Sequence, residues 1–257
     1  MVKKKLMKDF FNEDLAEHYV VNIKEVYPDF DGKNFVEEFT EDIDSKRMSE
    51  RIEKLSTLLR KYLPQDYIRA SQIIIDVLGE ENDIFYFPFE KMYYYRALAK
   101  FVEMYGLEDF DQSIKVIEEI TKRDTAEFAI RPFIKEDYDR VEVVFEKWKN
   151  SDNAHLRRLV TEGPRPRLPW AIHISYLRED INENFNLLKP FLNDPSRYVE
   201  KSVANHLNDL SRYEADQVVV FLESHFEASS PFVIKRALRT LKKQEHQGAL
   251  DLLSQLK

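Results

Sequence analysis

Apolar residues recur every three or four positions along almost the whole chain, and no segment keeps a two-residue alternation. In residues 48–62, Met48, Ile52, Leu55 and Leu59 follow at spacings of four, three and four, so they lie on one face of an α-helix. The chain has 257 residues, enough for a sizeable core, but only 5 glycines, which disfavours sandwiches, barrels and Gly-rich phosphate loops. The pattern predicts an all-α protein.

Turn and cap residues divide this pattern into short helices. Pro64 follows the apolar stripe at 48–62 and Gly79 follows the next one, and both residues are common just after a helix. The aromatic stretch IFYFPFEKMYYYR at 84–96 is expected to be a buried junction between helix pairs, because its acidic surroundings disfavour a base-stacking platform. The expected helices span about 12–26, 32–42, 48–62, 65–78, 91–105, 109–121, 125–135, 139–149, 153–161, 182–192, 196–208, 214–226, 231–243 and 246–256.

The second half of the chain contains a weak internal repeat. Three segments align, and a fourth aligns more loosely: SDNAHLRRLV (151–160), DPSRYVEKSV (194–203), SSPFVIKRAL (229–238) and TAEFAIRPFI (125–134). Each begins with polar turn residues and places an apolar anchor five positions later. The anchors are Leu156, Val199, Ile234 and, in the looser unit, Ile130. This pattern resembles the second helix of a HEAT repeat, although the spacing between units is irregular.

We therefore expect a HEAT-like helical-repeat solenoid with a concave face. Residues 1–257 are expected to form a single domain, with an acidic helical part at 1–120 and a repeat region at 121–257 that carries the site. In a stacked array, equivalent positions line one surface. Basic residues stand two places after the anchors, at Arg158, Lys201 and Arg236, with Arg131 one place after the looser anchor. Polar residues stand six places after them, at Glu162, Asn205 and Thr240. The alternative is that these basic side chains are only solvated.

The formal net charge of −8 argues at first sight against a nucleic-acid partner. The charge is unevenly distributed, however. Residues 1–120 carry 17 basic and 26 acidic residues, a balance of −9, whereas 121–213 has a balance of +1 and 214–257 is neutral. The acidity therefore belongs to the N-terminal part and does not oppose DNA binding by the repeat region.

The chain has no cysteine, which excludes disulfides, thiolate zinc sites and cysteine nucleophiles. Its basic start, MVKKKLMKDFF, lacks the apolar core and cleavage site of a signal peptide. No run of about 18 apolar residues occurs either. We expect a cytoplasmic protein without a membrane partner.

The segment EGPRPRLPW at 162–170 is the most unusual in the chain. Its three prolines exclude a regular helix and favour an extended, polyproline-like path. Arg165, Arg167 and Trp170 on such a segment suit phosphate contact and stacking on a base. The alternative is a rigid connection whose arginines cap carbonyls and whose Trp170 fills the core.

Carboxylates stand at three further points of interest. Glu127 falls in the first turn of the helix expected at 125–135, where an acid is often a simple cap. Glu162 ends a helix, where a negative charge is unfavourable and needs another reason. Asp209 lies in VANHLNDLS (203–211), whose polar residues are open to a capping interpretation. The six histidines show no metal-binding spacing, and nucleophile-elbow, Walker and dinucleotide motifs are missing.

Three of these segments, in this order, resemble AlkC, a branch of the HEAT-like AlkC/AlkD bacterial DNA alkylation-repair glycosylases. They are TAEFAIRPF, RRLVTEGPRPRLPWA and KSVANHLNDLS, and the N-terminal stretches MKDFFNEDLAEHY, YPDFDGKNF and MYGLEDFDQSI are similar too. The resemblance covers essentially the whole chain. Some AlkC proteins carry a C-terminal immunoglobulin-like domain, and the chain, which ends at Lys257 without a strand-rich tail, is expected to be a variant that lacks it.

The resemblance implies an N-glycosylase that removes cationic methylated bases: 3-methyladenine above all, with 3-methylcytosine or 1-methyladenine also in range. Matched position by position, the implied active-site residues are Glu127, Glu162, Trp170 and Asp209. Contacts to DNA are expected from Arg165, Arg167 and Asn205, besides the basic row of Arg131, Arg158, Lys201 and Arg236.

The implied partner is double-stranded alkylated DNA in the bacterial cytoplasm, at the nucleoid. The expected protein is a monomer without metal or cofactor that engages the lesion without burying a flipped base, unlike most glycosylases. The chemistry is consistent with carboxylates alone, since a base methylated at N3 is already cationic and the breaking glycosidic bond develops positive charge on the sugar. The competing hypothesis is a non-catalytic HEAT-repeat scaffold that binds nucleic acid or protein, because fold does not fix function.

Overall fold

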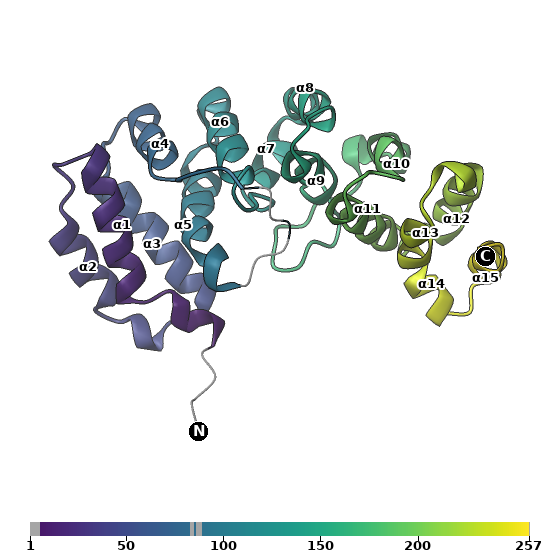
Figure 1. Ribbon diagram of the computed structural model, residues 1–257, viewed down its shortest axis with the longest axis horizontal. Helices are drawn as coiled ribbons and strands as arrows, with labels where there is room; N and C mark the ends of the chain where they lie inside the picture. The colour runs from purple at the N-terminus through teal and green to yellow at the C-terminus, as the bar shows by residue number, and fades with distance from the viewer. Residues whose placement is uncertain (1–5, 83–84, 86–88, 257) are drawn as a thin grey trace. The chain divides into compact units, whose positions relative to one another are not determined.

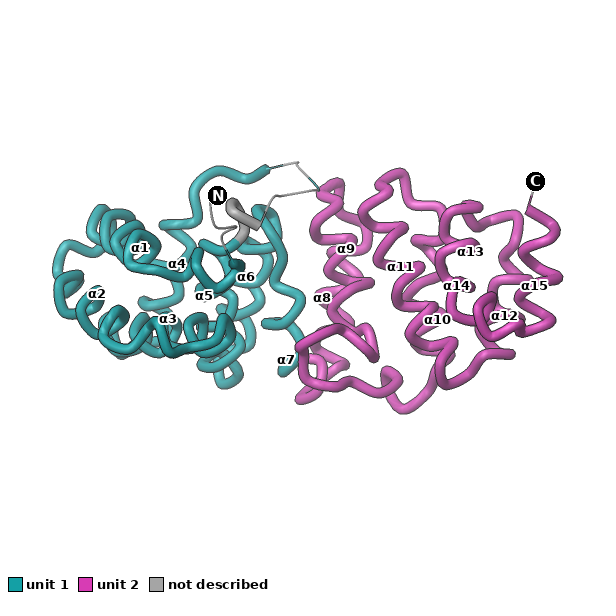
Figure 2. The backbone as a smooth tube through the Cα atoms, turned by 90° about the horizontal axis from the view of Figure 1, so that it is seen from below, with its two compact units in different colours: residues 1–133 teal, residues 134–257 magenta. Residues whose placement is uncertain are grey.

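The computed structural model describes residues 6–82, 85 and 89–256, and in these residues every regular element is a helix and none is a strand (Figure 1). The all-α prediction is therefore confirmed. The chain divides into two compact units, residues 1–133 and 134–257 (Figure 2). None of the described helices has the length and apolarity needed to cross a bilayer.

Unit 1 is built from helical pairs. Its helices are α1 (Glu13–Val26), α2 (Gly32–Thr40), α3 (Met48–Tyr62), α4 (Tyr67–Asp76), α5 (Phe89–Tyr105) and α6 (Phe110–Thr121), with short 3₁₀ turns at Met7–Phe10 and Ile43–Ser45. Helix α1 packs on α2, α3 packs on α5, and α4 packs on α6. Asparagine or aspartate caps the N-termini of α1, α2, α4 and α6 by accepting a backbone N–H from the first turn.

One glycine is required by the packing of unit 1. A Cβ atom at Gly32 would lie 2.2 Å from the Val20 side chain on α1. The start of α2 can therefore approach α1 this closely only because residue 32 has no side chain. Phe35 and Phe39 on α2 are both fully buried, so the close approach of the two helices seals the aromatic core of this unit.

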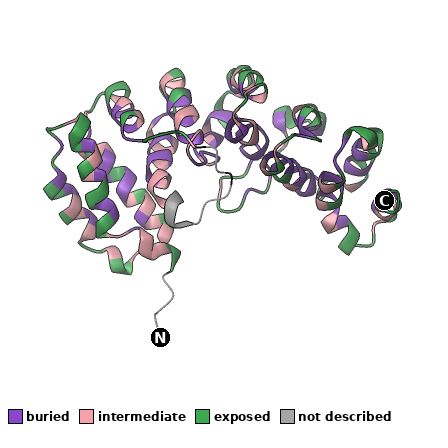
Figure 3. Ribbon diagram, in the orientation of Figure 1, coloured by how far each residue is buried: buried purple, intermediate pink, exposed green. Residues whose placement is uncertain are grey.

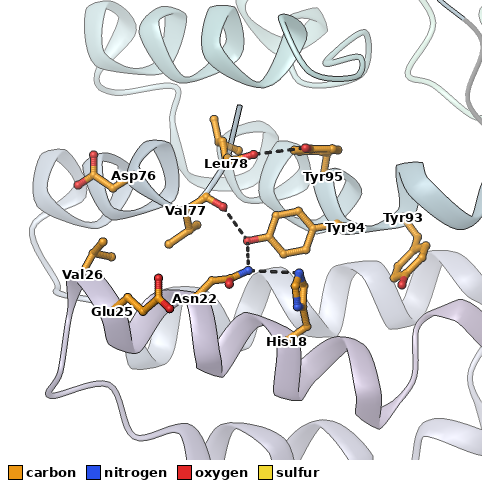
Figure 4. A pocket seen from close by; sticks show the side chains of 11 residues that line it. His18, Asn22, Glu25, Val26, Asp76, Val77, Leu78, Tyr93, Tyr94 and Tyr95 are labelled. Atoms are coloured by element: carbon orange, nitrogen blue, oxygen red, sulfur yellow. Dashed lines mark hydrogen bonds between the residues drawn. The ribbon is translucent and has the colours of Figure 1, made fainter. Parts of the chain in front are cut away.

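The aromatic stretch at 84–96 lies partly outside the described residues, which omit 84 and 86–88. In its described part, the ring of Tyr94 stacks on Tyr19 of α1 at 4.8 Å. The Tyr94 hydroxyl donates to the carbonyl of Val77, and burial raises its pKa to about 12. Tyr19 is fully buried, whereas Tyr93, Tyr94 and Tyr95 are half-buried. The three half-buried tyrosines line an open cavity of about 460 Å³ together with His18, Asn22, Glu25 and Asp76 (Figure 4).

Unit 2 consists of shorter helices in two layers. They are α8 (Tyr138–Lys149), α9 (Ala154–Glu162), α10 (Ile181–Leu188), α11 (Arg197–Leu210), α12 (Ala215–Ser224), α13 (Pro231–Ala237), α14 (Arg239–Lys243) and α15 (Gln247–Ser254). Helices α9, α11 and α13 pack side by side in that order, with α8, α10 and α12 in a second layer above them in Figure 1. Helix α11 is the centre of the unit and is buried along most of its length (Figure 3).

The internal repeat is confirmed by this arrangement. The three well-aligned segments form α9, α11 and α13, which are equivalent neighbours in one layer. Their anchors Leu156, Val199 and Ile234 are all at least 97% buried, as the repeat requires. Ile130, the anchor of the looser unit, is fully buried too, but it lies in a turn rather than in a helix.

Three expected helices differ markedly from the structure. The one expected at 182–192 ends with α10 at Leu188 and is followed by a 3₁₀ turn at Lys189–Phe191. The helix expected at 125–135 begins only at α7 (Arg131–Glu136), and residues 127–130 form turns. Pro132 has no N–H to donate, so it can occupy the first turn of a helix but not the interior of one that starts at 125. The helix expected at 231–243 breaks at Leu238, whose ψ of 3° lies outside the helical range, and becomes α13 and α14.

Candidate active site

A buried arginine in unit 2 joins two of the predicted acids. Arg165 donates from Nη1 to Oε1 of Glu162 at 2.6 Å and from Nε to Oδ2 of Asp209 at 2.9 Å. Nη2 lies 2.9 Å from the same Asp209 oxygen. The three side chains are between 5% and 8% exposed. We call Glu162, Arg165 and Asp209 the acid–arginine cluster.

Local backbone chemistry brings Arg165 back toward Glu162. Helix α9 ends at Glu162 because Pro164 cannot continue it, and the Arg165 N–H then donates to the Glu162 carbonyl at 3.2 Å. The proline-rich segment at 162–170 is thus a series of turns. Its prolines exclude a helix, as predicted, but the predicted extended path is wrong. The turns aim the Arg165 guanidinium inward at the acids, so it is not presented to solvent.

Glu162 is held at both carboxylate oxygens. Besides Arg165, Oε1 lies 3.4 Å from Nη2 of Arg158. Oε2 accepts from the hydroxyl of Ser202 on α11 at 2.6 Å, and the Thr161 hydroxyl donates to Ser202 at 2.7 Å. A carboxylate with this many charge-assisted and hydroxyl bonds is fixed in orientation. Its position at the end of α9 therefore has a tertiary reason, which the sequence pattern only hinted at.

Arg165 holds Asp209 through one carboxylate oxygen, Oδ2. Among the residues that the structure describes, the hydrogen bonds accepted by Asp209 end on Oδ2, which leaves Oδ1 to meet an incoming group. Burial lowers the pKa of Arg165, but the charges of Glu162 and Asp209 outweigh it and raise that pKa. The guanidinium is therefore a permanent positive partner that orients Asp209 through Oδ2.

Sequence reasoning missed two residues beside this cluster. Ser202, which bonds Glu162, lies on α11 between motif residues and has no distinctive signal. Arg239 on α14 is half-buried, and its pKa is lowered first by burial and then by the charge of Arg236, while the charge of Asp209 raises it. Arg239 is thus close enough to sense Asp209, although 30 positions separate the two in the chain.

Trp170 stands on the same loop as Arg165 and is 87% exposed. Its φ of 64° lies in the left-handed region, which costs a non-glycine residue about 1–2 kcal/mol. The predicted alternative, in which Trp170 fills the core, is wrong. Nearby on this loop, Arg167 donates to the hydroxyl of Tyr213 at 3.4 Å, so the proline-rich segment follows the C-terminal end of α11. An exposed indole in a strained backbone conformation indicates a binding role.

The predicted DNA-contacting residues of unit 2 differ in exposure. Lys201 is exposed, while Arg158 and Arg236 are half-buried. Arg158 lies over the ring of Tyr198 at 4.9 Å, and Arg236 donates to the side chain of Asn205 at 3.0 Å. These contacts link α9 to α11 and α11 to α13. The role of the four residues toward DNA stays a prediction.

Arg131 is a correction. The sequence pattern placed it among the DNA contacts, but its side chain is fully buried in the structure. The displaced start of α7 is the physical reason, because Arg131 becomes the first residue of a short helix whose neighbours Ile130 and Phe133 are in the core. A guanidinium at this depth cannot reach a phosphate, so Arg131 is withdrawn from the set.

Glu127 lies in unit 1 and is 9% exposed. Its carboxylate accepts a hydrogen bond from the hydroxyl of Thr125, and its N–H donates to the same hydroxyl at 3.4 Å. Because Glu127 precedes α7 by four residues, the helix-capping alternative is wrong. Within the described ranges, no group of three or more His, Cys, Asp or Glu residues is placed to hold a metal ion.

Residues 50–241 match the model of a protein family described as DNA alkylation repair enzyme. The chain belongs to this family. The matched range contains every residue of the acid–arginine cluster, as well as Glu127 and Trp170. The AlkC/AlkD resemblance inferred from the motifs is therefore confirmed, together with the helical-repeat fold that it implied.

Relatives of this family member include proteins with solved structures. The alkylpurine DNA glycosylase AlkC of Pseudomonas fluorescens, bound to DNA containing an abasic site analog, is 30% identical with a TM-score of 0.86, over 97% of this chain and 68% of that one. The uncharacterized protein YhaZ of Bacillus subtilis strain 168 is 32% identical over 251 residues, 96% of this chain and 67% of its own length. AlkD2 of Streptococcus mutans shares the fold at 24% identity, with a TM-score of 0.52 over 74% of this chain and 88% of that one.

Proposed function

We propose that this protein is a DNA N-glycosylase that hydrolyses the N-glycosidic bond of cationic alkylated bases in double-stranded DNA. 3-Methyladenine is the principal proposed substrate, with 3-methylcytosine and 1-methyladenine as further ones. The observation that carries the proposal is the acid–arginine cluster, in which the buried Asp209 carboxylate, among the residues that the structure describes, is held by Arg165 through Oδ2. The likeness to an alkylpurine DNA glycosylase bound to abasic-site DNA supports it, since an abasic site is what base excision leaves.

Asp209 is the proposed reaction centre within unit 2. The alkylated base already carries a positive charge, and cleavage moves positive charge onto the sugar. An ionised carboxylate that is fixed in advance stabilises that charge more than water can, because it does not have to reorient during the reaction. Oδ1 can also accept a proton from the attacking water. General-base assistance of this kind is typically worth about 10²–10⁴-fold in rate.

Glu162 has a different proposed role. Both of its oxygens are occupied by Arg165, Arg158 and Ser202, so it is poorly placed to take a proton. We assign it to holding Arg165 in position and to contributing negative potential near the reacting sugar. In this proposal Glu162 positions Arg165, and Asp209 is the acid that takes part in the reaction.

Trp170 is proposed to contact the cationic base. A cation over an indole face gains about 0.5–2 kcal/mol, and the 87% exposed ring is available for this contact. Arg167 and Lys201, both exposed, are proposed phosphate contacts. Binding to phosphates releases counterions, so we expect the affinity for DNA to fall as salt increases.

Substitution of Trp170 by glycine is expected to separate stability from activity. Glycine relieves the left-handed backbone at φ 64° but adds freedom to the unfolded chain, and the two effects of about 1 kcal/mol offset each other. The free energy of unfolding in urea should therefore stay within about 1 kcal/mol of wild type. Release of 3-methyladenine should fall about 2- to 30-fold from loss of the cation–π contact. Trp170→Phe, which keeps a ring, is the control and should lose less.

Glu127, in unit 1, is proposed to contribute a carboxylate to base release, from its position in the matched motif. Glu127→Gln keeps the hydrogen bond with Thr125 and removes the charge. We expect it to reduce release of methylated bases from alkylated DNA by about 100-fold or more. The exposed acid Glu136 on α7 gives a matched control, because Glu136→Gln removes the same charge nearby. A wild-type rate in folded Glu127→Gln would exclude it from the site.

A further inference from the structure

A fully buried histidine and asparagine connect three helices of unit 2 behind the acid–arginine cluster. His206 on α11 and Asn184 on α10 both have zero exposure. Nδ1 of His206 lies 2.8 Å from the carbonyl oxygen of Thr161 on α9, and Nε2 lies 3.0 Å from the side-chain nitrogen of Asn184. The side-chain oxygen of Asn184 accepts the N–H of Leu177 at 3.0 Å.

These partners assign the tautomer of His206. A carbonyl oxygen only accepts, so Nδ1 must carry the proton. The Asn184 amide uses its oxygen for the Leu177 N–H, so its nitrogen faces His206 and donates, which leaves Nε2 as an unprotonated acceptor. The imidazole is therefore neutral and every polar atom of the pair is satisfied. An apolar residue in place of His206 would leave the Thr161 carbonyl and the Asn184 amide buried without these hydrogen bonds.

The two outer hydrogen bonds of this network, at Thr161 and Leu177, lie on either side of one loop. The α9–α10 loop, residues 163–176, begins two residues after Thr161 and ends immediately before Leu177. It carries Arg165 and Trp170. His206 and Asn184 therefore hold the backbone on both sides of the loop that supplies the arginine of the cluster and the exposed indole.

The same network reaches Glu162 by a second route. Thr161 presents its carbonyl to His206, while its hydroxyl donates to Ser202, which donates to Glu162. A cap for the last turn of α9 needs only one donor. Here His206 and Asn184 together join the end of α9, helix α10 and the far end of the loop, which is more than capping requires.

We propose that His206 is a positioning residue for base excision. With Asn184, it fixes the α9–α10 loop so that Arg165 orients Asp209 and Trp170 meets the alkylated base. This inference rests on the proposed function for its catalytic consequence, but not for its structural part. A loop displaced by about 1 Å can cost on the order of 100-fold in rate without loss of substrate binding.

The test uses two variants and a matched control in the full-length protein. His206→Leu removes both hydrogen bonds. His206→Asn places an amide nitrogen where Nδ1 stood, so it keeps the bond to Thr161 and loses the bond to Asn184. His155→Leu is the control, because His155 is another buried histidine, on α9, at the end of that helix away from Glu162.

Two readouts separate positioning from general destabilisation. The first is the single-turnover release of 3-methyladenine from methylated DNA, measured beside DNA affinity. The second is limited cleavage by trypsin after Arg167, which is exposed and lies within the loop. Trypsin does not cut after Arg165, because Pro166 follows it. Formation of the fragment that begins at Leu168 is followed by mass spectrometry under conditions where each variant is folded.

We expect His206→Leu to release base at least about tenfold more slowly with unchanged DNA affinity, and to be cleaved faster after Arg167. His206→Asn, which keeps one of the two bonds, should lie between His206→Leu and wild type in both properties, and His155→Leu should match wild type in both. Wild-type rate and wild-type cleavage in folded His206→Leu, or equal losses in His155→Leu, would overturn the proposal. If wild type itself releases no base, the proposed function fails, and the cleavage rates alone still decide whether His206 holds the loop.

Discussion

Asp209→Asn is expected to lose about 10²–10⁴-fold of the rate of 3-methyladenine release while remaining folded. Asparagine has the shape of aspartate and can present its carbonyl oxygen to Arg165, so the loop and α11 keep their contact. Its amide nitrogen would replace Oδ1, which removes both the negative charge and the proton acceptor at the reacting centre. The rate should be measured in single turnover with enzyme in excess, so that product release does not mask the chemical step.

The matched control for this prediction is Asp216→Asn on α12. Asp216 is an exposed aspartate of the same unit and pairs with His246 on the surface at 3.0 Å, a contact of small energetic value. Its loss changes the net charge equally without touching the cluster. Equal rates for Asp209→Asn, Asp216→Asn and wild type would remove Asp209 from the mechanism.

Arg165→Ala is expected to lose both stability and activity. The substitution leaves two carboxylates buried without their shared partner, and breaking a buried ion pair in this way typically costs about 3–5 kcal/mol. The free energy of unfolding measured in urea should be lower than that of wild type by this amount. Base release should fall with it even where the variant is folded, because Asp209 loses the two bonds that orient Oδ2.

Arg167→Ala gives the contrast. It lies two residues further along the same loop, but it is exposed, and its contact with the Tyr213 hydroxyl is long, at 3.4 Å. We expect little change in stability and a weaker, less salt-dependent affinity for DNA. Equal stability of the two variants would mean that Arg165 does not hold the cluster together and would return it to the role of a phosphate contact.

The helices and the repeat could be predicted from sequence because their signals are local. The apolar spacing at 48–62 and the proline that follows it define α3 to the residue. The aligned segments predicted that α9, α11 and α13 are equivalent. The same reasoning went wrong at Pro132, where an apolar stripe continues across a residue that cannot donate a backbone hydrogen bond.

The inner contacts of the site could not be predicted in the same way. The motifs contained Glu162, Arg165 and Asp209, but nothing in their spacing says that Arg165 turns inward to join the other two. Ser202 and His206 act through contacts between residues that are 22 to 45 positions apart in the chain. Such contacts depend on how helices pack, which periodicity does not encode.

The most direct test of the proposed glycosylase activity is the release of free base from DNA methylated at adenine N3. The DNA is incubated with the wild-type protein, and the released base is analysed by chromatography. We predict time-dependent release of 3-methyladenine, one abasic site in the DNA for each base released, and release by Asp209→Asn that is slower by about 10²–10⁴-fold. Tight binding of the same DNA by folded wild-type protein, with no base released, would contradict it and favour a non-catalytic DNA-binding scaffold.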